Sequence, residues 1–238
     1  MRKRPAFLIA LAIFLGLSST VLGQSFGLTV SGGLASSRMN DMKYLQEHIL
    51  GTYPVPGKIT SSFPPYTSVT ISGFKQLYDQ IRVGGAYSYT TTGGKSSYAD
   101  YSGNISTEMT AISHRVGAYI SYRVIGGNRL DLSLNGRMDA NITSLTIQSY
   151  YEIYTYYNGA SNKYRSISPS ASVEAELMYK LKGFALGMNA GYLADLAGDL
   201  KDVENGNALL DPNDLEHTLV SDWTGWYVQL KAQIWLKF

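Results

Sequence analysis

The sequence predicts an all-β fold, an eight-stranded antiparallel up-and-down transmembrane β-barrel. The first observation is the alternation of apolar and polar residues over residues 226–238, which continues without a break and is the period of a strand with one apolar face. The second is a series of seven similar stretches before it. The third is composition, because 19 tyrosines and 24 glycines favour strands and turns over helices. An apolar face this long needs a protein core or a bilayer to cover it.

Residues 1–23 are expected to be a secretory signal peptide that is absent from the mature protein. Basic residues at positions 2–4 precede an apolar run at 7–17, and small residues lead to a plausible cleavage site after Gly23. The apolar run is shorter than a helical membrane span requires, which disfavours a retained anchor. One domain, residues 24–238, should then form the barrel, with no further domain after it.

Charge and composition exclude several classes of function. The formal net charge is +2, and the signal segment carries +3, so the rest of the chain has about −1. The positive net charge therefore comes from the signal segment, and no nucleic-acid partner is expected. The chain has no cysteines, so neither a disulfide nor a thiolate metal site is expected. Three histidines lie far apart in sequence without metal-ligand spacing. We expect no cofactor and no metal.

The strands follow one another along the chain with the same alternation. They are expected at residues 25–35, 66–74, 80–91, 106–125, 129–146, 164–181, 184–195 and 226–238. The stretch 129–146 is nearly ideal, since Leu130, Leu132 and Leu134 alternate with polar residues, whereas 66–74 is the weakest because only Val69 and Ile71 carry its alternation.

Long and short connections alternate between these strands. Long ones are expected at 36–65, 92–104, 147–163 and 196–220, the first with a short helix at 41–50. Short ones are expected at 75–79, 126–128 and 182–183. Neighbouring strands are antiparallel, so all long loops should lie at one end of the barrel. Outer-membrane barrels have this asymmetry, with long extracellular loops and short periplasmic turns.

Alternation alone leaves open which face points outward, because a soluble lipocalin-like barrel would place the apolar set inside. Two features favour a membrane. The polar sides of the stretches 25–35 and 184–195 are mostly Gly, Ala, Ser and Asn, whereas a soluble surface would carry more charge. Aromatic residues also mark the ends of the apolar faces, at Phe184 and Tyr192 and at Trp226 and Phe238, as in the two interfacial girdles of a bilayer.

With these features the chain resembles small bacterial outer-membrane β-barrels of the OmpA/OmpX type, of the sort found in Bacteroidetes-like bacteria. The resemblance covers residues 24–238, and it includes the segment RVGGAYSYTTTGG at 82–94. It implies location in the outer membrane, in contact with its lipid. It also implies that the barrel-assembly machinery reads a C-terminal signal formed by Ile234, Leu236 and Phe238.

Eight charged residues on the polar faces should point into the barrel. They are Arg82, Arg115, Arg137, Asp139, Glu174, Glu176, Lys180 and Lys231. Charges in so narrow a lumen must be paired and hydrogen-bonded. One interpretation is a structural ion-pair network that fills the barrel. The other is a gated polar path or a small binding site.

The loops are the expected functional surface. The stretch 147–163 is rich in tyrosines, which either bind sugars or a partner protein, or extend the strands and sit at headgroup level. The stretch 196–220 is acidic without a calcium-loop spacing. We expect a non-enzymatic barrel with a structural, adhesive or surface-binding role. The alternatives are a narrow channel or small-ligand carrier and, less favoured, a lipid-modifying enzyme that uses His114.

Overall fold

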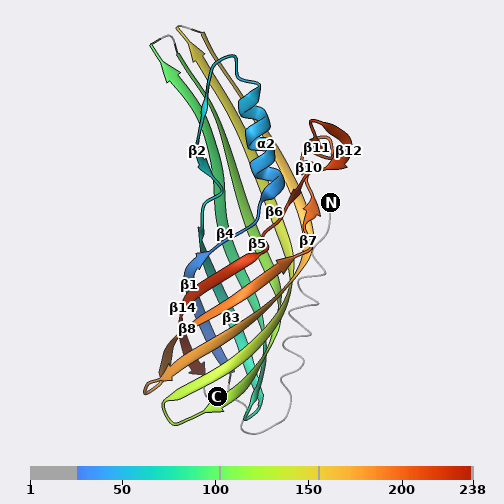
Figure 1. The fold of residues 1–238 in the computed structure, drawn as a ribbon. Coiled ribbons are helices and arrows are strands. Elements are labelled where there is room, and N and C mark those ends of the chain that lie inside the picture. The colour runs from blue at the N-terminus through green and yellow to red at the C-terminus, as the bar shows by residue number, and fades with distance from the viewer. Residues whose placement is uncertain (1–25, 102, 155, 237–238) are drawn as a thin grey trace.

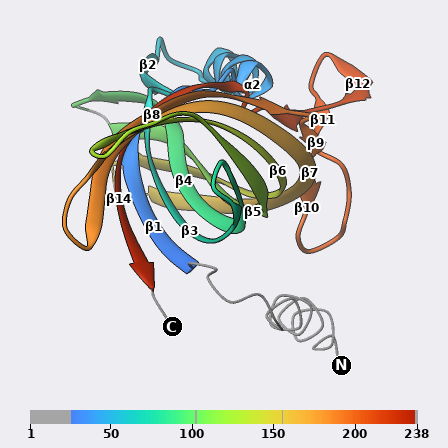
Figure 2. The same cartoon turned by 90° about the horizontal axis from the view of Figure 1, so that it is seen from below.

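The computed structural model describes residues 26–101, 103–154 and 156–236 (Figure 1), so the expected signal peptide and Phe238 lie outside the described residues. Eight antiparallel strands close into a ring, which Figure 2 shows end on. In order around the ring they are β1 (Phe26–Ala35), β3 (Tyr66–Tyr78), β4 (Ile81–Asp100), β5 (Gly103–Gly126), β6 (Leu130–Ile153), β7 (Tyr156–Lys180), β8 (Phe184–Asp195) and β14 (Gly225–Leu236). Pairing of β14 with both β8 and β1 closes the barrel.

The remaining elements belong to the two long connections. The first holds α2 (Asn40–Gly51) and β2 (Lys58–Ser62), which pairs with β4. The last holds β9 (Gly198–Asp199), β10 (Lys201–Asp202), β11 (Leu210–Asp211), β12 (Asp214–Thr218) and β13 (Val220–Ser221). Within the described parts of the chain, no helix combines the length and apolar character needed to span a membrane.

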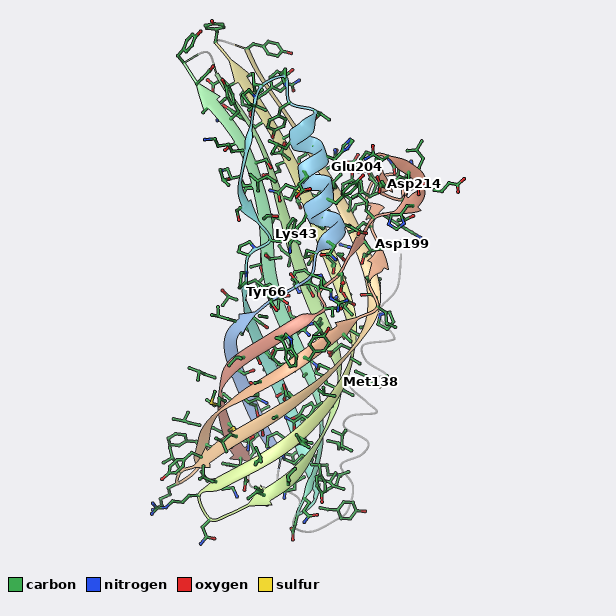
Figure 3. All side chains as sticks on the ribbon, in the orientation of Figure 1. Lys43, Tyr66, Met138, Asp199, Glu204 and Asp214 are labelled. Atoms are coloured by element: carbon green, nitrogen blue, oxygen red, sulfur yellow. The ribbon has the colours of Figure 1, made fainter. Side chains whose placement is uncertain are left out.

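The apolar residues of the alternation point outward, which confirms the membrane barrel and excludes the lipocalin-like arrangement. Leu134, Met138 and Leu230 are 56%, 75% and 73% exposed, and Met138 is labelled on the outer side of the barrel wall in Figure 3. The polar residues between them are buried in the lumen, as Ser88 and Asn141 show at 0% exposure. An outer surface this apolar is stable only against hydrocarbon.

Two of the expected loops are wrong, because residues 92–104 and 147–163 are almost entirely strand. Thr92 pairs with Ala111, and Tyr150 pairs with Gly159. The glycines, serines and tyrosines of these stretches suggested loops, yet each has a cross-strand partner that supplies its backbone hydrogen bonds. As a result β4 to β7 rise far beyond the other four strands (Figure 1). We call this extension the blade, formed by residues 92–100, 103–111, 145–153 and 156–163.

The apolar and polar sides of the strands change places where the barrel becomes the blade. On β6 the inward side runs through Asn141 and Thr143 and then changes to Leu145 and Ile147. The outward side changes from Met138 to polar residues such as Gln148. Lipid covers the outward apolar residues of the barrel, but water surrounds the blade, so apolar residues there must turn inward to be buried. The inversion therefore marks the outer edge of the membrane.

A second core forms on the inner side of the blade, above the barrel mouth. We call it the mouth core, and its buried members are Ala35, Met39, Met42, Leu45, Phe63, Tyr66, Met109, Ala111, Leu145, Ile147, Leu193, Leu200, Leu219 and Trp223. Helix α2, expected at 41–50, contributes Met42 and Leu45. Gly94 of the blade faces this helix, and a Cβ there would be 2.8 Å from Gln46 Oε1, so the Gln46 side chain would have to shift.

Candidate functional site

Four charged residues form one connected cluster in the lumen, which we call the lumen network. Glu176 accepts a hydrogen bond from Arg82 at 2.8 Å and forms a second ion pair with Lys231. Lys231 also contacts Glu174 at 3.1 Å. These side chains come from β4, β7 and β14, so the network links strands that are far apart around the ring. Side-chain exposures between 5% and 17% show that little water reaches it.

Glu174 has the most complete set of partners in the lumen. Besides Lys231, it accepts hydrogen bonds from Asn135 and Asn189, both at 2.6 Å, and from the Tyr227 hydroxyl at 3.0 Å. Burying a carboxylate is costly unless its lone pairs are satisfied in this way. The environment of Glu174 is thus that of a structural ion, with no free lone pair left for proton transfer.

The other expected lumen charges lie apart from this network. Arg137 donates from Nε to Asp139 at 2.6 Å and from Nη1 to Ser88 at 2.9 Å. Arg115 is 7% exposed, yet no described carboxylate lies within ion-pair distance of it. Lys180 is at the end with the short turns, where it pairs with Asp131 at 2.8 Å, and Arg123 approaches the same carboxylate at 3.6 Å.

Neutral lumen residues are the part of the site that the sequence prediction missed. Asn135 and Asn189 bind the carboxylates, and Gln229 bonds with Ser31 at 3.1 Å and Ser68 at 3.2 Å. All of them fall on the inward-facing positions of their strands, so the alternation would have placed them in the lumen. Selection by charge omits amides and hydroxyls.

The mouth core closes the lumen from above. Trp223 is fully buried, packs edge-on against Tyr66 with ring centroids 5.3 Å apart, and donates from Nε1 to Thr143 at 2.9 Å. Tyr66 is labelled in Figure 3 between the barrel and the blade, where these contacts lie. Between this core and the lumen network, the described residues leave a central cavity of about 30 Å³, which is room for only one or two water molecules.

The tyrosines expected in a loop instead lie at the far end of the blade. We call them the tyrosine tip: Tyr98, Tyr101, Tyr150, Tyr151, Tyr154, Tyr156 and Tyr157. Tyr101 is 96% exposed, Tyr154 74% and Tyr157 65%. The rings of Tyr150 and Tyr157 pack with centroids 5.0 Å apart. The expected strand extension is confirmed, whereas the expected position at headgroup level is not, because these tyrosines lie beyond the inversion that marks the membrane edge. Binding of a sugar or a partner protein stays a prediction.

Carboxylates organise the hydroxyl groups of the tyrosine tip. Tyr98 donates to Asp100 at 2.9 Å, and Tyr150 donates to Glu152 at 2.6 Å. The hydrogen bond to Asp100 raises the pKa of Tyr98, and the one to Glu152 raises the pKa of Tyr150. The surface combines exposed aromatic rings with fixed acceptors, a composition suited to ligand binding.

The acidic connection uses its carboxylates to fix turns. Asp202 accepts from the backbone N–H of Glu204 at 2.7 Å, and Asp214 accepts from that of Glu216 at 3.1 Å. Asp199, Glu204 and Asp214 are spread over this connection in Figure 3. No group of three or more metal-ligating side chains occurs among the described residues.

The remaining candidates lie on the outer surface. His114 is within 2.8 Å of the Tyr87 hydroxyl and packs against Tyr89 at 5.4 Å. Tyr192 and Trp226 pack at 4.8 Å and form part of the outer aromatic girdle. Ile234 of the expected assembly signal is 45% exposed toward lipid, and Leu236 ends β14.

No protein-family model matches the sequence, and no curated protein matches it. Among solved structures, Neisserial surface protein A has a TM-score of 0.42 at 11% identity, over 89% of this chain and 98% of its own. A major outer membrane protein from Thermus thermophilus has a TM-score of 0.46 at 10% identity, over 90% and 100%. The attachment invasion locus protein Ail of Yersinia pestis has 0.37 at 12%, over 88% and 97%.

With TM-scores below 0.5, these likenesses add no weight to the assignment, which rests on the strands themselves. Eight strands pair in a closed antiparallel ring, their apolar sides face outward, and one end carries short turns while the other carries long extensions. The chain therefore forms an eight-stranded transmembrane β-barrel with a filled lumen and a long blade, the architecture that is typical of small outer-membrane proteins.

Proposed function

We propose that the protein is a non-enzymatic surface-binding barrel whose binding site is the tyrosine tip. The observation that carries this proposal is the exposure of large aromatic rings at the end of a continuously paired, four-stranded extension. Rings such as those of Tyr101 and Tyr154 lie in water, although neither lipid nor the mouth core requires them there. Tyrosine supplies a large contact area at a small cost in side-chain entropy, which is why it is enriched in binding sites.

The blade provides a stiff support for such a site. Strands β5 and β6 remain paired from the barrel wall up to Gly103 and Ile153, and β6 and β7 remain paired up to Tyr156. The mouth core and α2 brace the inner side of the blade near its base. A contact on the tyrosine tip is thereby held well away from the membrane. We infer that the ligand is a glycan or a protein at the surface of another cell, or a component outside the cell.

Binding can be measured with the full-length protein in lipid nanodiscs, on a glycan array and on immobilised extracellular matrix proteins. We expect Tyr101→Ser/Tyr154→Ser/Tyr157→Ser to lower the affinity for whichever ligand is found by about tenfold or more, because aromatic anchors dominate interface energies. A matched control, Val203→Ser/Leu215→Ser, removes exposed apolar residues from the last connection instead. The proposal fails if the triple variant binds as well as the wild type, or if both variants lose binding equally.

A narrow channel is the second candidate, and the lumen gives it little support. Arg82, Glu176 and Lys231 cross the lumen, and the mouth core covers its outer opening. An enzyme that uses His114 also lacks support, because the neighbours of this imidazole are tyrosine rings rather than a carboxylate.

A further inference from the structure

Arg115 is a buried cation for which the described residues supply no counter-charge. Its guanidinium is always protonated in proteins and carries five N–H donors. No carboxylate lies within ion-pair distance, and no side chain accepts a hydrogen bond from it among the described residues. An unpaired charge buried to 7% exposure is strongly destabilising unless something else compensates it.

A second guanidinium, that of Arg137, lies in the same region of the lumen as Arg115. Arg137 donates from Nη1 to Ser88, and Ser88 is the direct cross-strand neighbour of Arg115 on β4. The Nη2 group of Arg137 is buried without a hydrogen-bond partner. Asp139 is the acid of this region; its Oδ1 accepts from Arg137 Nε, and its Oδ2 is buried without a hydrogen-bond partner. Two cations therefore share one carboxylate.

The acids lower in the lumen do not correct this imbalance. Lys231 and Arg82 pair with Glu174 and Glu176, so that group is neutral by itself. Higher up, Asp195 accepts hydrogen bonds from Ser168, Asn141 and the backbone N–H of Trp223, and no described guanidinium lies within ion-pair distance of it. Among the described residues, Arg115 is therefore left without a direct anionic partner.

A cavity of the right size lies at this position. It measures about 30 Å³, and Arg115, Arg137, Ser172 and Tyr227 are among its lining residues. This volume holds roughly one or two water molecules, or a monatomic anion of similar size. Glu174 also borders the cavity, although its oxygens are directed at Lys231, Asn135, Asn189 and Tyr227.

We propose that this cavity is a binding site for a halide-sized monoanion, held between the guanidinium groups of Arg115 and Arg137. Chloride is the abundant ion of this class. Because the mouth core and the lumen network close the barrel on both sides, the anion enters as the barrel folds and then stays in place. Its role is to give the guanidinium of Arg115 a direct anionic partner.

The direct test is a crystal structure of protein refolded from urea in sodium bromide. We expect an anomalous bromide peak within contact distance of both Arg115 and Arg137. A structure with only water at this position, or with bromide only on the outer surface, overturns the proposal.

A solution test uses thermal unfolding in detergent after refolding in sodium chloride or in sodium gluconate of equal ionic strength, since gluconate is too large for the cavity. At a chloride concentration near 100 times its Kd, the midpoint should rise by about 5–10 °C over that in gluconate. Two variants should abolish this difference: Arg115→Met removes the excess charge, and Ser88→Asp supplies a carboxylate between the two guanidiniums. An equal chloride effect in wild type and Arg115→Met contradicts a site at Arg115.

Discussion

Glu176 is the residue that joins the lumen network, since it pairs with Arg82 on one side and Lys231 on the other. Its side chain is 5% exposed, so almost no solvent compensates for its partners. We expect Glu176→Gln to lower the free energy of unfolding by about 3–5 kcal/mol, because the substitution leaves an uncompensated buried cation. Urea titration in detergent micelles measures the change.

The matched control for Glu176→Gln is Glu204→Gln, the same chemical change at an exposed position of the last connection. We expect no measurable change in stability there. A loss smaller than about 1 kcal/mol for Glu176→Gln would mean that the lumen admits enough water to solvate Arg82 and Lys231.

At the scale of single residues, the alternation along a strand predicted which side chains point into the lumen. Charge alone did not predict which of them interact there. Alternation was sufficient to direct Arg82, Glu174 and Lys231 toward one another, because side chains of like parity share a face. It could not indicate that Arg115 lies outside ion-pair distance of every described carboxylate, since pairing depends on the stagger between strands and on side-chain rotamers. The neutral partners Asn135 and Asn189 were omitted because nothing in their local sequence distinguishes them from other polar residues.

At the scale of elements, the limits of β1 and β8 and the position of α2 followed from local pattern. The blade did not, because its apolar residues change faces at the membrane edge. A search for one continuous pattern ends at Leu145, where the inward side becomes apolar, and so it assigns a loop beyond that point. The alternation with a period of two continues into the blade, but the outward side meets water there instead of lipid.

The inversion on β6 can be tested with one substitution at two positions on the same outward face. Leu134→Arg places a charge in the lipid belt, where Leu134 is 56% exposed, and should cost about 2–4 kcal/mol. Gln148→Arg introduces the same side chain beyond the inversion, where the outward face meets water, and should leave the folding free energy almost unchanged. Reversible folding into lipid vesicles measures both. Similar costs at the two positions would place the membrane edge elsewhere.

At the scale of the whole molecule, two barriers in series separate the two ends of the barrel. The lumen network crosses the interior, and the mouth core with α2 covers the outer opening. Because each barrier is a packed and paired structure, opening one of them leaves the other closed. The remaining central cavity of about 30 Å³ is too small to form a continuous water path.

We therefore expect the purified protein to show no steady conductance in planar bilayers, where insertion is verified by heat-modifiable migration of the same sample on a gel. Arg137→Ala and Glu174→Gln should likewise remain silent, since neither substitution removes the mouth core above the lumen. Reproducible channels that either substitution abolishes would contradict this expectation and would assign transport to the charged lumen. The tyrosine tip would then be an accessory surface, because a conducting lumen needs no rigid platform held so far above the membrane.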